Sequence, residues 1–418
     1  MKKINVSSEI GTLKRVIVHR PDEGIERVSP KRAEELLFDD IVYLPQMQEE
    51  HDVFTGILKA FLGEENVLET QQLIFEALEN DKEGKKETLE MIIDFEELPT
   101  SFIDALLAKP NQELAEILIT GYDEKNDHIL FDPIPNFIFT RDIAITVNDH
   151  VIITKAAKIA RARENLLTRF IFWSHPIFQE LKEKDRIINL NKKDEFPPSK
   201  KGESVSIEGG DVMIINQDYL LIGCSERTSQ HAVHSLRDIL FKKGVVKNVV
   251  QINIPDDRSY MHIDTIFTQI NNDHIAAFKP IIVDGMSSNV EVHKINGTSR
   301  FYNSVKEFFL NEINPNMKFI LSGNGESPYQ EREQWTDGCN LVALKPGVAL
   351  TYDRNTKTNE AFEKMGYQVI PAIELLEKIK KGEIKAEEVA NTIITLPSNE
   401  LSRARGGSHC MTCPIERV

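Results

Sequence analysis

The sequence predicts an α/β fold in which one small unit recurs five times and a helical segment interrupts the series. Short β-rich runs occur in pairs joined by tight turns, and helical stretches separate the pairs. A different pattern fills residues 46–128, where apolar residues follow the spacing of helices. We therefore expect one α/β domain over residues 1–418, with residues 46–128 as a helical insertion after the first unit.

The two strands of each pair are joined by a turn rich in Asn, Asp, Pro and Gly, which favour chain reversal. The first unit contributes a strand at residues 13–19. The later runs are 137–140 with 143–154, 212–215 with 219–222, 263–270 with 274–278, and 341–344 with 348–352.

The inserted segment reads as several helices. The stripe Val53, Phe54, Ile57, Leu58 places apolar side chains on one helical face. A later helix is expected to follow Asn111 and to stop at a glycine, residue 121.

Composition and charge restrict the class of protein. The 418 residues carry 50 Lys and Arg against 66 Asp and Glu, which gives 50 − 66 = −16, so nucleic acid and anionic membranes are poor partners. No apolar run approaches the roughly 18 residues of a membrane span, and the first residues lack the apolar core of an export signal. We expect a cytoplasmic protein whose four cysteines are free thiols. The oligomeric state stays open, a homo-oligomer included.

Four polar segments stand where strands should bury apolar residues. They are Phe139-Thr140-Arg141-Asp142, Glu208-Gly209-Gly210-Asp211, Met261-His262-Ile263-Asp264, and the stretch 405–414 that contains His409-Cys410-Met411-Thr412-Cys413-Pro414. Each lies at the edge of a different unit, so a pseudo-symmetric assembly would bring all four to one central place.

Taken singly, these segments have ordinary structural explanations. His262 and Asp264 would share one face of a strand, as an edge pair or a solvated strand end. The two glycines beside Glu208 are typical of a turn, and Arg141 with Asp142 could form a surface ion pair. A metal site is disfavoured, because no second histidine lies nearby in a ligand spacing.

Cys410 is the most specific signal, because it follows a glycine-rich loop close to the end of the chain. A redox or zinc pair with Cys413 and an inert thiol are the alternatives to a nucleophile. A cysteine nucleophile needs a group that shuttles protons, and His262 oriented by Glu208 could supply it.

The remaining carboxylates, Asp142 and Asp264, indicate the charge of the substrate. Several carboxylates around one thiol oppose thiolate formation. A guanidinium resolves the conflict, because its planar fork pairs with carboxylates and its positive charge favours an adjacent thiolate.

These residues resemble the arginine deiminase family of the guanidine-modifying (pentein) superfamily. The resemblance extends over almost the whole chain. Besides the four polar segments, the matching motifs are Glu331-Arg332-Glu333-Gln334-Trp335, Leu36-Leu37-Phe38-Asp39-Asp40 and Tyr352-Asp353-Arg354-Asn355-Thr356.

The resemblance implies a five-bladed α/β propeller of ββαβ units around a central active site, with a helical insertion. It also implies hydrolysis of L-arginine to L-citrulline and ammonia through an amidino-thioether on Cys410, without a metal or organic cofactor. In that scheme His262 shuttles protons, Glu208 orients it, and Asp142 and Asp264 hold the guanidinium. The implied substrate-binding residues are Asn136, Arg161 and Arg227 for the carboxylate, Phe139 and Leu37 for the pocket wall, and Arg405 as a mobile residue over the site.

The chain differs from the family pattern at two positions of the loop before Cys410, and other functions are alternatives to the one that the resemblance implies. Ala404 and Ser408 replace residues that are commonly glycine in the family loop, which leaves gating and recognition of the substrate's amino group open. Arg163 is the alternative to Arg161. Rival functions are an agmatine or dimethylarginine hydrolase, an amidinotransferase, or a catalytically silent arginine-binding protein.

Overall fold

The computed structural model describes residues 3–38, 40–255, 257–286 and 288–418. Within these residues the strands form five sheets of three or more strands and one short pair. The strands, sheet by sheet, are β1 (Leu13–Val18), β2 (Val67–Glu69) and β20 (Cys413–Arg417); β5 (Ala144–Val147), β6 (His150–Ile153) and β7 (Ile187–Asn189); β8 (Val212–Asn216), β9 (Tyr219–Cys224), β10 (Asn248–Asn253), β13 (Val290–Lys294) and β14 (Ser299–Tyr302); β11 (Phe267–Gln269), β12 (His274–Ala277) and β15 (Lys318–Leu321); β16 (Val342–Lys345), β17 (Val348–Tyr352), β18 (Gln368–Pro371) and β19 (Thr392–Leu396); and the pair β3 (Tyr122–Asp123) and β4 (His128–Ile129).

The α-helices lie between these strands along the chain. They are α1 (Leu44–Leu62), α2 (Thr70–Asn80), α3 (Lys82–Phe95), α4 (Ser101–Leu107), α5 (Asn111–Thr120), α6 (Ala162–Ser174), α7 (Gln179–Glu183), α8 (Gln230–Lys243), α9 (Lys279–Ile282), α10 (Val305–Phe308), α11 (Tyr329–Trp335), α12 (Thr356–Lys364) and α13 (Ala372–Lys380).

The same three-strand arrangement recurs in all five sheets. An antiparallel pair comes first, and its second strand then pairs in parallel with a later strand, as β5, β6 and β7 do. The other four sets are β8-β9-β10, β11-β12-β15, β16-β17-β19 and β20-β1-β2. A parallel pair needs a crossover connection, and α1, α6 and α8 lie in three of these crossovers. The predicted mixed α/β fold with five strand-pair units is therefore confirmed.

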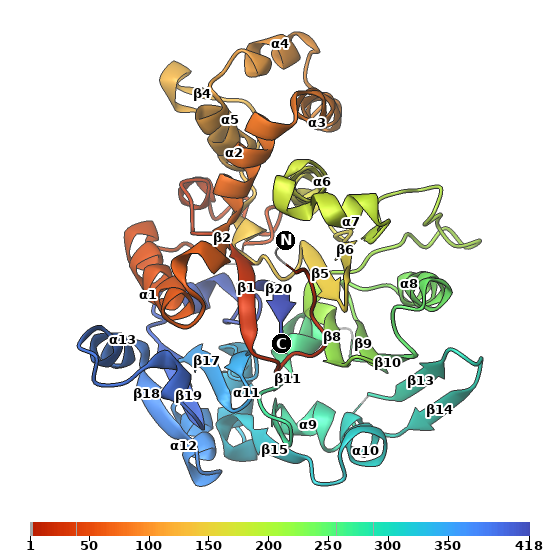
Figure 1. The fold of residues 1–418 in the computed structure, drawn as a ribbon, viewed down its shortest axis with the longest axis vertical. Coiled ribbons are helices and arrows are strands. Elements are labelled where there is room, and N and C mark those ends of the chain that lie inside the picture. Colours follow the sequence, from red (N-terminus) through yellow and green to blue (C-terminus); the bar gives the residue numbers. More distant parts are fainter. Residues whose placement is uncertain (1–2, 39, 256, 287) are drawn as a thin grey trace.

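The first unit takes its antiparallel partner from the far end of the chain. β1 pairs with β20, and Ile17 faces Cys413 across that pair. Both strands lie in the middle of the view in Figure 1, near the marked chain ends. Since Cys410 lies three residues before the first residue of β20, this pairing fixes the predicted nucleophile at the centre of the fold.

Two segments that the sequence predicts as strand are 3₁₀ turns instead. Residues Pro135–Ile138 and Ile263–Thr265 are helical turns, and the strands begin only at Ala144 and Phe267. Thr265 Oγ1 donates to the carbonyl of His262 at 2.7 Å. Such local side-chain bonds compete with ladder pairing, so the prediction that His262 and Asp264 share a strand face was wrong.

The helices of residues 46–128 pack in two places. Phe54, Ile57 and Leu58 of α1 lie in one apolar cluster with residues of β17, β19 and α13. Helices α2–α5 share another cluster with α6 and extend away from the sheets at one end of the molecule (Figure 1). Gly121 ends α5 with a φ of 70°, the left-handed conformation expected of a glycine stop. The division into one domain with an insertion at 46–128 stays a prediction.

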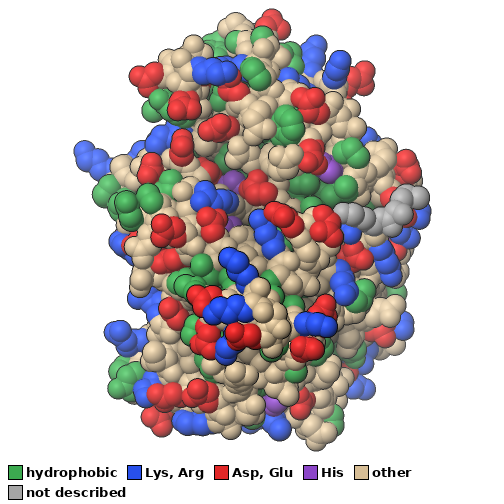
Figure 2. Space-filling model, turned by 60° about the vertical axis from the view of Figure 1, so that its left-hand side comes forward, with side chains coloured by type: hydrophobic (Ala, Val, Ile, Leu, Met, Phe, Trp, Pro, Cys, Tyr) green, Lys and Arg blue, Asp and Glu red, His purple; other side chains and the backbone are tan. Residues whose placement is uncertain are grey.

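The surface carries charges of both signs. On the face shown in Figure 2, Lys and Arg side chains are interspersed with Asp and Glu. In the described part of the chain, every helix falls short of the length and apolar character needed to cross a membrane.

Candidate active site

The predicted site residues meet at one cavity of about 360 Å³. All four polar segments contribute to its wall. Ten of the eleven predicted residues line it: Leu37, Asn136, Phe139, Asp142, Arg161, Glu208, Arg227, His262, Arg405 and Cys410. Asp264 is the eleventh and lies behind the thiol, fully buried.

The Cys410 thiol is held between two side chains. Its Sγ donates to Asp264 Oδ2 at 3.4 Å and accepts from Asn340 Nδ2 at 3.1 Å. Burial, followed by the charges of Asp264, Asp142 and Asp337, raises the pKa of the Cys410 thiol well above its usual value. In this state the sulfur is a neutral S–H, so a nucleophilic role requires a cation beside it.

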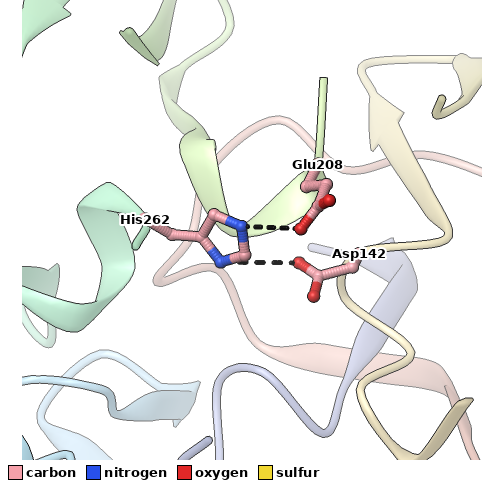
Figure 3. A group of neighbouring side chains, drawn as sticks. All are labelled: Asp142, Glu208 and His262. Atoms are coloured by element: carbon pink, nitrogen blue, oxygen red, sulfur yellow. Dashed lines mark hydrogen bonds and ion pairs between the residues drawn. The ribbon is translucent and has the colours of Figure 1, made fainter. Parts of the chain in front are cut away.

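His262 and Glu208 form a buried pair at the cavity wall (Figure 3). Nε2 of His262 lies 3.0 Å from Glu208 Oε2, and Nδ1 lies 3.8 Å from Asp142 Oδ1. Burial lowers the pKa of His262, but the negative charge of Asp142 and the bond to Glu208 outweigh it and raise that pKa to about 10. The imidazole is therefore an imidazolium at neutral pH, ready to donate a proton.

A glycine makes room for this imidazole. A Cβ built on Gly210 would lie 2.5 Å from His262 Nδ1, closer than any side chain tolerates. Gly210 therefore has a steric function beside His262, beyond marking a turn. Gly210 also donates its N–H to Asp142 Oδ1 at 2.9 Å, which fixes that carboxylate.

Arg161 neutralises the carboxylates beside His262. Its Nη1 lies 2.7 Å from Asp142 Oδ2 and 3.3 Å from Glu208 Oε2, and its Nη2 lies 2.8 Å from Glu164 Oε2. Arg163, the alternative considered above, points elsewhere and pairs with Glu96. Arg161 is thus the arginine of this segment that belongs to the cavity.

Asp142, Glu208 and His262 also have the composition of a metal site, with ligand atoms within 4.8 Å of one another. Their charges favour an ion-pair network instead. His262 with a pKa of about 10 holds protons on both ring nitrogens, and a metal ligand must give one up. Arg161 already compensates both carboxylates.

His409, the neighbour of the thiol, points away from the cavity. Its Nδ1 lies 2.8 Å from Asp264 Oδ2 and its Nε2 lies 3.3 Å from Glu9 Oε2. Burial raises the pKa of Asp264, but the bond to His409 outweighs it and that pKa is lowered. Asp264 is therefore an anion in contact with the thiol.

Arg405, on the loop before Cys410, lines the cavity. Its φ is 61°, and its guanidinium carbon lies 3.3 Å from the centre of the Trp335 ring. A cation over an indole face is a favourable contact. This gives the Trp335 motif a function that its sequence did not reveal.

The two loop departures from the family pattern fit this backbone. Ala404 ends a 3₁₀ turn, and the left-handed residue is Arg405. Ser408 Oγ donates to the carbonyl of Leu350 at 2.7 Å and accepts from the N–H of Val342 at 3.1 Å. The serine thus ties the loop to β16 and β17.

The other two motifs brace the same loop. Tyr352 donates its hydroxyl to the carbonyl of Gly406 at 2.6 Å, and Arg354 bonds Ser402. Asp40 pairs with Arg403, whose Nε lies 2.9 Å from Asp40 Oδ2. Asp39 of the first motif lies outside the described residues.

We expect Glu208→Gln to lower the pKa of His262 by at least about one unit, because the neutral amide removes a buried negative charge at 3.0 Å. In the wild type, the raised pKa means that the ion pairs of His262 stabilise the fold fully below its ordinary value of 6.5. This contribution is lost as the pH rises through about 10. An NMR titration of the His262 ring in both proteins measures the shift, and an unchanged pKa would contradict the pairing.

Comparisons with known proteins agree on one family. A family model described as arginine deiminase matches residues 34–417. The arginine deiminase of Listeria monocytogenes serotype 4b is 33% identical over 441 residues, covering 99% of this chain and 98% of that protein. The arginine deiminase of Bacillus cereus is 35% identical over 447 residues, with the same coverage.

Solved structures of the pentein superfamily share the fold. The product-bound N-terminal domain of ArgZ, a cyanobacterial arginine dihydrolase, matches 96% of this chain and 97% of that chain, with a TM-score of 0.52 at 13% identity. An adduct of dimethylarginine dimethylaminohydrolase with S-methyl-L-thiocitrulline matches 96% of this chain and 99% of that chain, with a TM-score of 0.50 at 12% identity. At these identities the similarity concerns the fold alone.

Proposed function

Because this chain belongs to the arginine deiminase family, we propose that it hydrolyses L-arginine to L-citrulline and ammonia. The observation that carries the proposal is the arrangement of one thiol, one histidine–glutamate pair and the Arg161-paired carboxylate of Asp142 around a single cavity. Such a site attacks a carbon whose substituents are cationic nitrogens.

The reaction divides into two halves at Cys410. With the substrate cation beside it, the Cys410 thiol releases its proton to solvent, and the thiolate attacks the guanidinium carbon. His262 donates its own proton to the departing nitrogen, which leaves as ammonia, and the amidino-thioether remains on Cys410. Neutral His262 then takes one proton from water as the water oxygen bonds to the same carbon. The second water proton passes to solvent, and the C–S bond breaks to release citrulline and the thiolate. Glu208 keeps the histidine ring oriented throughout, since it bonds Nε2 at 3.0 Å.

The carboxylates account for recognition of the guanidinium. We assign this function to Asp142 and Asp264. Asp142 lines the cavity, while Asp264 lies 3.4 Å from the sulfur. Arg161 now occupies Asp142 Oδ2. An arginine substrate would replace this internal ion pair. Its guanidinium would bind Asp142, and its carboxylate would bind Arg161.

The remaining predicted residues surround the rest of the substrate. Arg227 has a buried Nε that lacks a hydrogen-bond partner among the described residues, so it has a donor to offer the carboxylate together with Asn136. Phe139 and Leu37 supply apolar wall, and Arg405 closes over the site. We further propose that the five sheets form a five-bladed propeller and that the enzyme works in the cytoplasm without a metal or organic cofactor.

We expect arginine to exceed agmatine in kcat/KM by at least about 10²-fold. Agmatine lacks the carboxylate, so Arg161 and Arg227 lose their partner in the complex. The assay measures citrulline or carbamoyl-putrescine together with the released ammonia or methylamine, using arginine, agmatine and methylated arginine side by side. Equal values for arginine and agmatine would move the assignment to an agmatine hydrolase, and a preference for methylated arginine would move it to a dimethylarginine hydrolase.

A further inference from the structure

We propose that Asn340 is a further catalytic residue, whose side-chain amide donates a hydrogen bond to the Cys410 sulfur and holds it as the attacking thiolate. This rests on the proposed function of Cys410 as nucleophile. Asn340 is fully buried, and its Nδ2 lies 3.1 Å from the sulfur. It comes from the segment before β16, and no pattern in the sequence marks it.

Four contacts fix which end of the amide faces the sulfur. Oδ1 of Asn340 accepts the backbone N–H groups of His409 and Cys410, both at 3.1 Å. Nδ2 donates to the carbonyl of Asp264 at 3.1 Å as well as to the sulfur. A flipped amide would set its oxygen against that carbonyl and its NH₂ against two N–H donors, so the sulfur receives a donor.

The two side chains that contact the sulfur act on it in opposite ways. Asp264 is an anion, so it attracts the S–H but repels the thiolate. Asn340 donates, so its bond strengthens when the sulfur becomes negative. Accordingly the carboxylates raise the pKa of the Cys410 thiol, whereas the hydrogen bond from Asn340 lowers it.

The loop before Cys410 is shaped to admit this amide. A Cβ built on Gly407 would lie 2.6 Å from Asn340 Oδ1, so a larger residue at 407 would displace the amide. Asn340 itself is positioned by its own N–H, which donates to the carbonyl of Asp337 at 3.0 Å. The contact therefore joins two loops that are 70 residues apart.

Asn340→Asp tests the proposal with little change of shape, because it keeps the acceptor for both backbone N–H groups and replaces the donor by a carboxylate oxygen. Alkylation of Cys410 by iodoacetamide is followed as a function of pH without substrate, and peptide mass spectrometry separates Cys410 from the partly exposed Cys224. We expect the alkylation midpoint to rise by at least one pH unit and the rate at pH 8 to fall at least tenfold. The fold decrease in kcat should exceed the fold change in KM.

Ser408→Ala is the matched control, because Ser408 is a buried polar residue of the same loop that bonds Val342, Leu350 and the backbone carbonyl of Asn340, but not the Asn340 side-chain amide. Its alkylation midpoint should equal that of the wild type. Circular dichroism establishes folding of each variant, and Asn340→Ser, which lacks the amide donor, replaces Asn340→Asp if the latter does not fold.

A wild-type alkylation profile in the folded variant would overturn the role of Asn340, even if activity were lost. That result would leave the proposed function intact. A Cys410→Ser variant that still turns over arginine would instead remove the nucleophile, and with it the basis of both proposals.

Discussion

Cys410→Ser is expected to abolish citrulline formation, with kcat reduced by about 10⁴-fold or more. A serine hydroxyl ionises far less readily than a thiol, whose ordinary pKa is about 8.5. In this site burial and three carboxylates already oppose ionisation of the Cys410 thiol, so a hydroxyl has no route to the required anion. Citrulline release from saturating arginine measures the effect.

Cys413→Ser is the control for that loss. Cys413 is buried three positions further on, and its Sγ donates to the carbonyl of Ala144 at 3.2 Å, a bond that a hydroxyl retains. We expect most of the activity to remain. If Cys413→Ser were inactive and Cys410→Ser active, the assignment of the nucleophile would be reversed.

His262→Ala is expected to lower kcat by about 10² to 10⁴-fold, the usual contribution of a proton-transfer group. The variant lacks the imidazolium that protonates the departing nitrogen, and Glu208 and Asp142 then lose one of the cations that separate their charges, although Arg161 still contacts both. Steady-state assays with arginine, followed over pH, measure the loss.

His409→Asn separates proton transfer from support of the site. His409 is buried and precedes Cys410 directly in the sequence. Its ring nevertheless bonds Asp264 and Glu9 instead of lining the cavity. We expect a smaller loss of kcat than in His262→Ala. If His262→Ala kept the wild-type kcat while His409→Asn were inactive, the proton-transfer role would have been assigned to the wrong histidine.

The strand pairs were predictable because they depend on local sequence. β8 with β9 and β16 with β17 follow from apolar runs flanking polar turns, as does the stop of α5 at Gly121. The 3₁₀ turn at Ile263–Thr265 was not predictable from periodicity, because a hydroxyl of Thr265 and a carboxylate of Asp211 take the backbone groups that a ladder would use.

The sequence predicted which residues belong to the site, but not the contacts between them. Polar residues interrupting β-rich runs indicated Asp142, Glu208 and His262, which line one cavity. The contact of Asn340 with the sulfur joins positions 70 residues apart, and nothing local marks it. The pairing of β1 with β20 is equally non-local, although it places the thiol.

Mass spectrometry of acid-quenched reactions tests the covalent intermediate most directly. Wild type and His262→Ala are mixed with arginine, quenched over a range of times, digested, and searched for the peptide that contains Cys410. The account predicts a peptide heavier by arginine less one ammonia in at least one of the two proteins, with the modification on Cys410 and not on Cys413. An unmodified Cys410 peptide at every time in both proteins, while the wild type releases citrulline, would contradict it.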